Sequence, residues 1–133
     1  MTIYEKLSAI QAELNAPKNQ YNSYGGFYYR NCEDILNALK PLCKAQKTVL
    51  VIADNLLQIG DRYYVESVAT LHDLESKEHI EVTAYAREEE TKKGMDGSQV
   101  TGASSSYARK YALNGLFCID DAKDSDYTNG IQN

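Results

Sequence analysis

The sequence predicts an α+β fold: an antiparallel β-meander with N-terminal helices and a long C-terminal helix packed on it. Three observations lead to this prediction. Apolar residues recur at helical spacing from Ile3 to Leu14. Apolar and polar residues alternate on both sides of a two-residue turn, Gly60-Asp61. A third segment, from Ser98 to Leu113, again has helical periodicity.

The first 30 residues are expected to form a helix, a loop and a short strand. The helix ends at Asn15-Ala16-Pro17, because the residue before a proline avoids the helical region. Residues 18–26 are polar and rich in Tyr and Asn, which predicts a loop, and residues 27–30 predict a strand. The apolar stripe of the helix is made by Ile3, Leu7, Ile10 and Leu14.

A second helix is predicted from Asn31 to about Lys44. Asn31 is a suitable N-cap residue, and Asp34 follows it by three positions. Pro41 weakens the end of this helix, because proline removes a backbone hydrogen bond.

The centre of the chain predicts three antiparallel strands that bury one face. They cover residues 48–59, with a kink at Asp54-Asn55, then 62–72 and 79–87. Alternation assigns one residue in two to the buried face. On this basis we expect the core to receive Tyr63, Val65, Ala69, Leu71, Ile80, Val82, Ala84 and Ala86.

The third helix is expected to have two different faces and to end at Asn114-Gly115. A helical wheel assigns the buried stripe to Val100, Ala103, Ser104, Tyr107, Ala108 and Tyr111. The opposite side receives Gln99, Gly102, Ser106, Arg109 and Lys110. The many small residues have two explanations, close packing of the helix on the sheet or close approach of a ligand to the helix.

Composition sets limits on the function. The net charge of −5, from 14 basic and 19 acidic residues, argues against nucleic-acid binding if the chain is taken as a whole. The charge is uneven, however, and local patches matter more because salt screens distant charges. We expect a core domain over residues 1–119 and an acidic, disordered tail over residues 120–133.

Several classes of protein are not expected. The longest apolar run, residues 49–53, is too short to span a membrane, and the N-terminus does not resemble a signal peptide. Three cysteines without C-x-x-C spacing predict reduced thiols in an intracellular protein and no zinc site. No nucleotide-binding loop or nucleophile motif is found, and His72 and His79 are expected at the surface.

The segment from Lys92 to Asp121 closely resembles the signature of the ERF (essential recombination function) family. The resemblance is carried by Lys92-Lys93-Gly94-Met95-Asp96, Gln99-Val100-Thr101-Gly102-Ala103, the run from Ser106 to Phe117, and Ile119-Asp120-Asp121. Tyr28-Tyr29-Arg30, Glu33-Asp34-Ile35-Leu36 and Leu39-Lys40-Pro41-Leu42 match the N-terminal half of the family. The family is similar to the eukaryotic ring-forming annealing mediators, in which a Lys-Arg pair on the long helix corresponds to Arg109-Lys110 in reversed order.

This resemblance implies a cytoplasmic, ATP-independent single-strand annealing protein of phage recombination and DNA repair, without enzymatic activity, cofactor or metal. The expected partners are single-stranded DNA, further copies of the chain in a ring or filament, and a phage exonuclease or single-strand binding protein. Such a protein needs a basic groove for phosphates and aromatic rings for bases. The residues expected to bind DNA are Arg109, Lys110, Lys92, Lys93, Arg30, Gln99, Ser106 and Tyr28.

Two other functions stay open. One is a phage partner-binding protein on the same fold that does not anneal DNA. The other is a metal-dependent nuclease that uses Asp120, Asp121 and Asp124.

Overall fold

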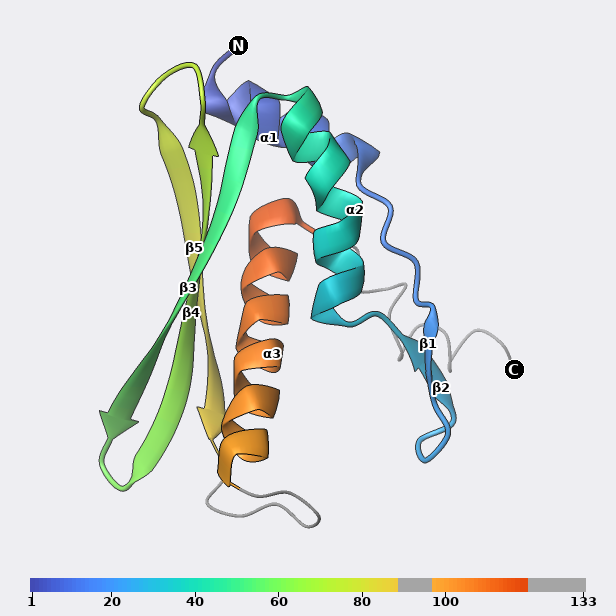
Figure 1. The fold of residues 1–133 in the computed structure, drawn as a ribbon, viewed down its shortest axis with the longest axis vertical. Helices are drawn as coiled ribbons and strands as arrows, with labels where there is room; N and C mark the ends of the chain where they lie inside the picture. The colour runs from blue at the N-terminus through green and yellow to red at the C-terminus, as the bar shows by residue number, and fades with distance from the viewer. Residues whose placement is uncertain (89–96, 120–133) are drawn as a thin grey trace.

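The computed structural model describes residues 1–88 and 97–119 and has the predicted α+β architecture (Figure 1). Residues 89–96 and the predicted tail at residues 120–133 lie outside these ranges. Along the chain the described elements are α1 (Ile3–Glu13), β1 (Gln20–Asn22), β2 (Phe27–Tyr29), α2 (Cys32–Ala45), β3 (Thr48–Ile59), β4 (Arg62–Asp73), β5 (His79–Glu88) and α3 (Gly97–Phe117).

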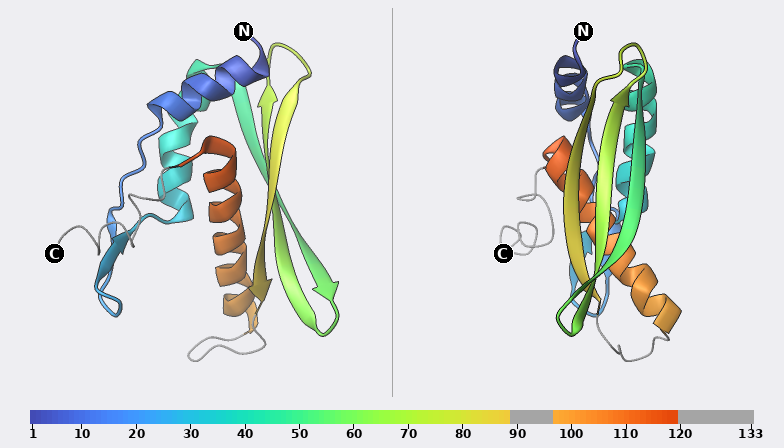
Figure 2. Two further views of the ribbon diagram at one scale, coloured as in Figure 1. Left: turned by 180° about the vertical axis from the view of Figure 1, so that it is seen from behind. Right: turned by 90° about the vertical axis from the view of Figure 1, so that its left-hand side faces the viewer.

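The meander is a twisted antiparallel sheet in the order β3-β4-β5. The pairing of β3 with β4 runs without interruption from Thr48↔Asp73 to Ile59↔Arg62, so the predicted kink at Asp54-Asn55 does not break the ladder. The described helices lie on one side of this sheet, and the right-hand view of Figure 2 looks onto the uncovered side. The sheet therefore has one face for the core and one face for solvent.

Both N-terminal helices begin with a capping box. The Thr2 side chain accepts a hydrogen bond from the Glu5 backbone, and the Glu5 side chain accepts one from the Thr2 backbone. Asn31 and Asp34 make the same reciprocal pair at α2, which confirms the predicted N-cap. Helix α2 continues through Pro41 to Ala45.

The core lies between the sheet and the three helices. The predicted inward residues Val65, Ala69 and Leu71 are buried, and Ile80, Val82 and Ala84 pack against the core. Tyr63 is 48% exposed, so its predicted burial is wrong. It is the second residue of β4, directly after the β3–β4 turn. The helices contribute mainly Ile3, Ile10, Ile35, Leu39, Leu113, Leu116 and Phe117.

The predicted loop over residues 18–26 is also wrong in part, because residues 20–22 form strand β1. This strand pairs with β2 in a separate hairpin, from Gln20↔Tyr29 to Asn22↔Phe27. Its polar residues show no apolar alternation, so the pattern did not predict a strand. The Asn22 side chain closes the turn by accepting hydrogen bonds from the backbones of Tyr24 and Gly25.

Helix α3 continues past its predicted end at Asn114-Gly115 to Phe117. Gly115 serves packing here, because a Cβ atom at this position would lie 3.1 Å from Val82 Cγ1 on β5. The chain turns out of the helix at Cys118, which has a positive φ of 50°.

A buried ion network fastens α1 to the end of β4. Lys6 is only 2% exposed, and its Nζ lies 2.6 Å from Asp73 Oδ1 and 2.7 Å from Glu75 Oε1. Asp73 also accepts hydrogen bonds from the Glu75 backbone and the Ser76 hydroxyl. The bond from Lys6 is the main reason that the pKa of Asp73 falls to about 2, with smaller contributions from Glu75 and Ser76.

This network predicts a specific loss of stability in acid. An aspartate in an unfolded chain has a pKa of about 3.9, above the pKa of about 2 that Asp73 has in the fold. The ionised Asp73 therefore stabilises the fold above about pH 4, and this contribution is lost as the pH falls towards 2. We expect thermal unfolding midpoints to fall less steeply over this range in Asp73→Asn than in the unsubstituted protein. Equal slopes would contradict the assignment.

Candidate nucleic-acid interface

Helix α3 packs on the sheet through a stripe of small residues. Ser104, Ala108 and Ala112 are at most 6% exposed. Burial of Ser104 and Ala108 was predicted, but Tyr107 and Tyr111, assigned to the same stripe, are 52% and 53% exposed. The helix is thus rotated about its axis relative to the prediction. Small side chains at the contact let the helix lie close to the sheet, and such a contact has no room for two tyrosine rings.

The predicted outer face is confirmed for two residues and wrong for one. Gly102 and Ser106 are exposed. Arg109 instead turns towards β3, where its Nε lies 2.9 Å from Asp54 Oδ2. Lys110, the next residue along the helix, is partly buried and projects about 100° away from Arg109 around the axis. The two cations therefore point to neighbouring sides of α3, as on the predicted helical wheel.

The Asp54 carboxylate joins β3, β4 and α3. It accepts hydrogen bonds from Ser67 Oγ at 2.7 Å, Ser105 Oγ at 2.5 Å and Arg109 Nε at 2.9 Å. Partial burial raises the pKa of Asp54, but the bonds from Ser105, Ser67 and Arg109 outweigh this effect and the pKa is lowered overall. Asp54 is thus held as a carboxylate whose orientation fixes the Arg109 side chain.

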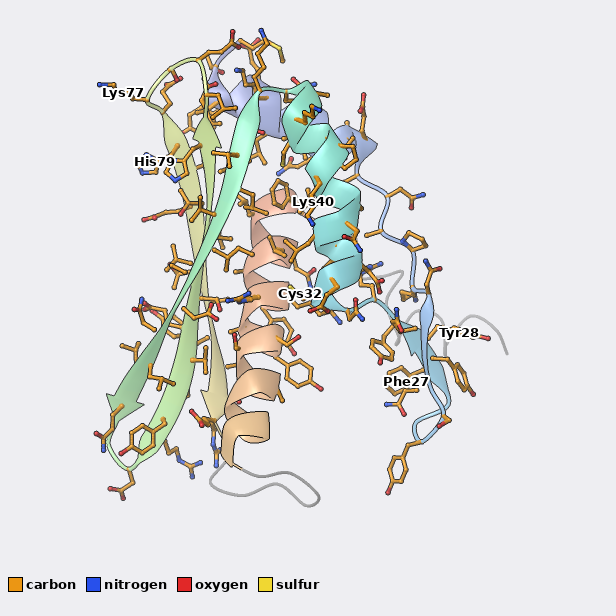
Figure 3. The ribbon with its side chains drawn as sticks, in the orientation of Figure 1. Phe27, Tyr28, Cys32, Lys40, Lys77 and His79 are labelled. Carbon is orange, nitrogen blue, oxygen red and sulfur yellow. The ribbon has the colours of Figure 1, made fainter. Side chains whose placement is uncertain are left out.

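The β1–β2 hairpin carries a second group of aromatic rings. Figure 3 labels Phe27 and Tyr28 on β2. Tyr28 is 46% exposed, and its ring centroid lies 4.8 Å from that of Tyr21 on β1. In Figure 1 and in the left-hand view of Figure 2, α3 lies between the sheet and this hairpin.

Arg30, which follows β2, is a structural residue. It is only 4% exposed, and its Nε donates a 2.7 Å hydrogen bond to the Ala16 carbonyl. This bond ties the hairpin to the segment that follows α1. The Arg30 side chain is thus almost fully enclosed, and the phosphate contact expected of it stays a prediction.

The remaining predicted residues are placed unevenly. Lys92 and Lys93 lie outside the described residues, and Gln99 belongs to α3 but its side chain lies outside the described part as well. The structure therefore gathers Ser106, Arg109 and Lys110 on one helix and places Tyr28 on a separate hairpin. Sequence reasoning missed Asp54, although an acidic residue on the inward face of a strand signals a buried partner.

Other kinds of site find little support in the described part of the chain. Residues 1–88 and 97–119 contain no cluster of His, Cys, Asp and Glu that could hold a metal ion. Asp120, Asp121 and Asp124 of the nuclease hypothesis lie outside these ranges. The three cysteines are free thiols, as predicted, and burial raises the pKa of Cys32 and Cys43. Among the described helices, none is long and apolar enough to cross a membrane.

Comparison with known proteins identifies the family. The chain is 61% identical over 123 residues to the protein of Salmonella phage P22 described as "Essential recombination function protein". The match covers 92% of this chain but 58% of that relative, so the chain spans less than two thirds of its length. No solved structure gives a significant match. The model of the ERF superfamily matches residues 3–133, and the chain therefore belongs to this superfamily.

Proposed function

We propose that this chain binds and anneals single-stranded DNA without ATP during phage or prophage recombination. Family membership and the similarity to the essential recombination function protein of phage P22 support a role in recombination. The observation that carries the proposal is the Asp54–Ser105–Arg109 arrangement, which holds a partly exposed guanidinium on the long helix.

Arg109 is suited to recognise a phosphate without reading sequence. Arg109 bonds to Asp54 through Nε, and this bond does not use the two terminal amino groups of the guanidinium. Terminal amino groups bind phosphate oxygens in a forked geometry. Lys110 adds a point charge on the neighbouring side of the helix, and Tyr28 offers an exposed ring to a base. Contacts to phosphates and ring faces are alike for every nucleotide, as annealing of any sequence requires.

A ring or filament of copies would compensate for the weak basicity of each subunit. The chain has a net charge of −5, and Asp54 offsets much of the charge of Arg109. Linked sites raise the overall affinity because each further contact becomes intramolecular. We therefore propose an oligomer that places many copies of α3 along one strand in the bacterial cytoplasm, with a phage exonuclease or single-strand binding protein as partner.

One observation favours the alternative of a partner-binding protein. An apolar hollow of about 530 Å³ lies between α2 and β3, lined by residues that include Leu36, Leu39 and Leu50. Lys40 of α2, labelled in Figure 3, also lines it. Apolar surface beside exposed lysines suits an acidic protein segment. In this alternative the chain would form a defined complex with another phage protein and would not anneal DNA.

The first prediction concerns the two cations of α3. We expect the unsubstituted protein to accelerate annealing of two labelled complementary oligonucleotides without ATP, and the acceleration to disappear at high salt. Arg109→Ala with Lys110→Ala should weaken binding and reduce the slope of log affinity against log salt by about 0.7 for each phosphate that is no longer bound. The control is Lys77→Ala in the β4–β5 turn (Figure 3), which should behave as the unsubstituted protein. Unchanged binding by the folded double variant would remove this site.

The second prediction separates the position of Arg109 from its charge. If only charge mattered, Asp54→Asn would strengthen DNA binding because it removes a negative group. We expect it instead to weaken binding by about three- to tenfold, since a neutral amide holds a guanidinium less firmly than a carboxylate. Fluorescence anisotropy with a labelled single strand measures this. Asp61→Asn, in the exposed β3–β4 turn, is the matched control. Tighter binding by Asp54→Asn would show that Asp54 does not position Arg109 for DNA.

A further inference from the structure

Two tyrosines on the exposed side of α3 form a stacked pair that the core does not use. The rings of Tyr107 and Tyr111 lie one helical turn apart, with centroids separated by 6.5 Å and planes inclined by 19°. Both side chains remain about half exposed, at 52% and 53%. A tyrosine in a core buries most of its large apolar ring, whereas these two rings remain half exposed. The pair is therefore available for another contact.

We propose that Tyr107 and Tyr111 form a stacking platform for unpaired nucleobases. This inference rests on the proposed function and adds a second kind of contact to it. Arg109 is turned towards β3, about 160° around the helix axis from both rings, so the phosphate contact and the base contact would be on opposite sides of α3. The sequence pattern assigned both rings to the core, so the structure is what reveals this surface.

The orientation of the rings suits contact with bases. Their planes are inclined by 19° and their centroids are 6.5 Å apart, so the two rings are nearly parallel. Stacking on aromatic rings tolerates every base because each base has a π-face. The pair is therefore suited to a single strand of any sequence.

The surroundings of the pair leave space for a strand to approach. Ser106, the residue before Tyr107, is exposed. Gly102 is exposed on another side of α3, where it lines a small hollow with Asp54 and Ser105, and a Cβ atom on it would meet nothing within 4 Å. Packing within the protein therefore does not require a glycine at position 102. Of the two explanations for the small residues of this helix, close approach of a ligand agrees better with this position. Lys110 lies about 60° from Tyr107 and about 100° from Tyr111 around the helix axis, so it adds a positive charge on the neighbouring side of α3.

The test compares two oligonucleotides of equal length and charge, one of thymidines and one wholly abasic. The full chain should bind the thymidine strand more tightly, because only this strand can stack. Tyr107→Ala with Tyr111→Ala should lose about fivefold or more in affinity for the thymidine strand and little for the abasic strand. Tyr107→Phe with Tyr111→Phe should restore the difference, since phenylalanine keeps the ring face. The control is Tyr85→Ala on β5, because Tyr85 is exposed to the same extent, 52%.

A second measurement on the unsubstituted protein covers the case in which the alanine variant does not fold. Nitration of Tyr107 and Tyr111, followed by mass spectrometry, should be slowed by the thymidine strand and much less by the abasic strand. The platform is overturned if the folded alanine variant keeps the full preference for thymidines. It is also overturned if both strands protect the rings equally, or if the substitutions alter only the size of the oligomer, which would assign the pair to a contact between copies. Failure of the unsubstituted protein to bind either strand would instead reject the proposed function itself.

Discussion

The close contact between α3 and the sheet is the constraint on which the rest of the structure depends. Residues with small side chains line the contact from Ser104 to Gly115, and at Gly115 a Cβ atom would already crowd Val82. In the observed rotation of the helix about its axis, small side chains face the sheet. That rotation buries Ala108 and Ala112, and it turns Tyr107 and Tyr111 outwards. The exposed aromatic surface is therefore a consequence of how the core packs.

The same rotation explains why an acidic residue belongs beside the proposed DNA site. Because Arg109 lies at the border of the packed face, it needs a partner there, and Asp54 supplies one at 2.9 Å. Ser67 and Ser105 bond to the same carboxylate, so β3, β4 and α3 meet in one polar cluster. An arginine that is paired with a carboxylate adds little net positive charge, and its main contribution to DNA binding is a guanidinium held in a fixed orientation. This agrees with a chain whose net charge is −5. Affinity for DNA would then come from many aligned copies.

Much of the fold follows from short-range patterns, whereas the site depends on long-range contacts. The capping signal at Asn31 and the alternation around Val65 and Ala69 predicted the elements correctly, because caps and strand faces depend on neighbouring residues. The β1–β2 hairpin was missed because its residues are polar on both faces. The orientation of α3 was wrong because the helical wheel ranked tyrosine as apolar, and both rings are exposed in the structure. Asp54 lies on the inward face of a strand, which signals a buried partner, but that partner is 55 residues away and the sequence pattern does not identify it.

The measurement that tests the central claim most directly is photo-crosslinking of the full chain to a single strand that carries 5-iodouracil, with the crosslinked residues identified by mass spectrometry. The probe reacts with aromatic side chains that contact the base, and eleven tyrosines distributed over the chain can report. We predict crosslinks at Tyr107 and Tyr111, with Tyr28 as a further site on the hairpin. Crosslinks confined to the uncovered face of the sheet, at Tyr64 or Tyr85, would contradict this claim.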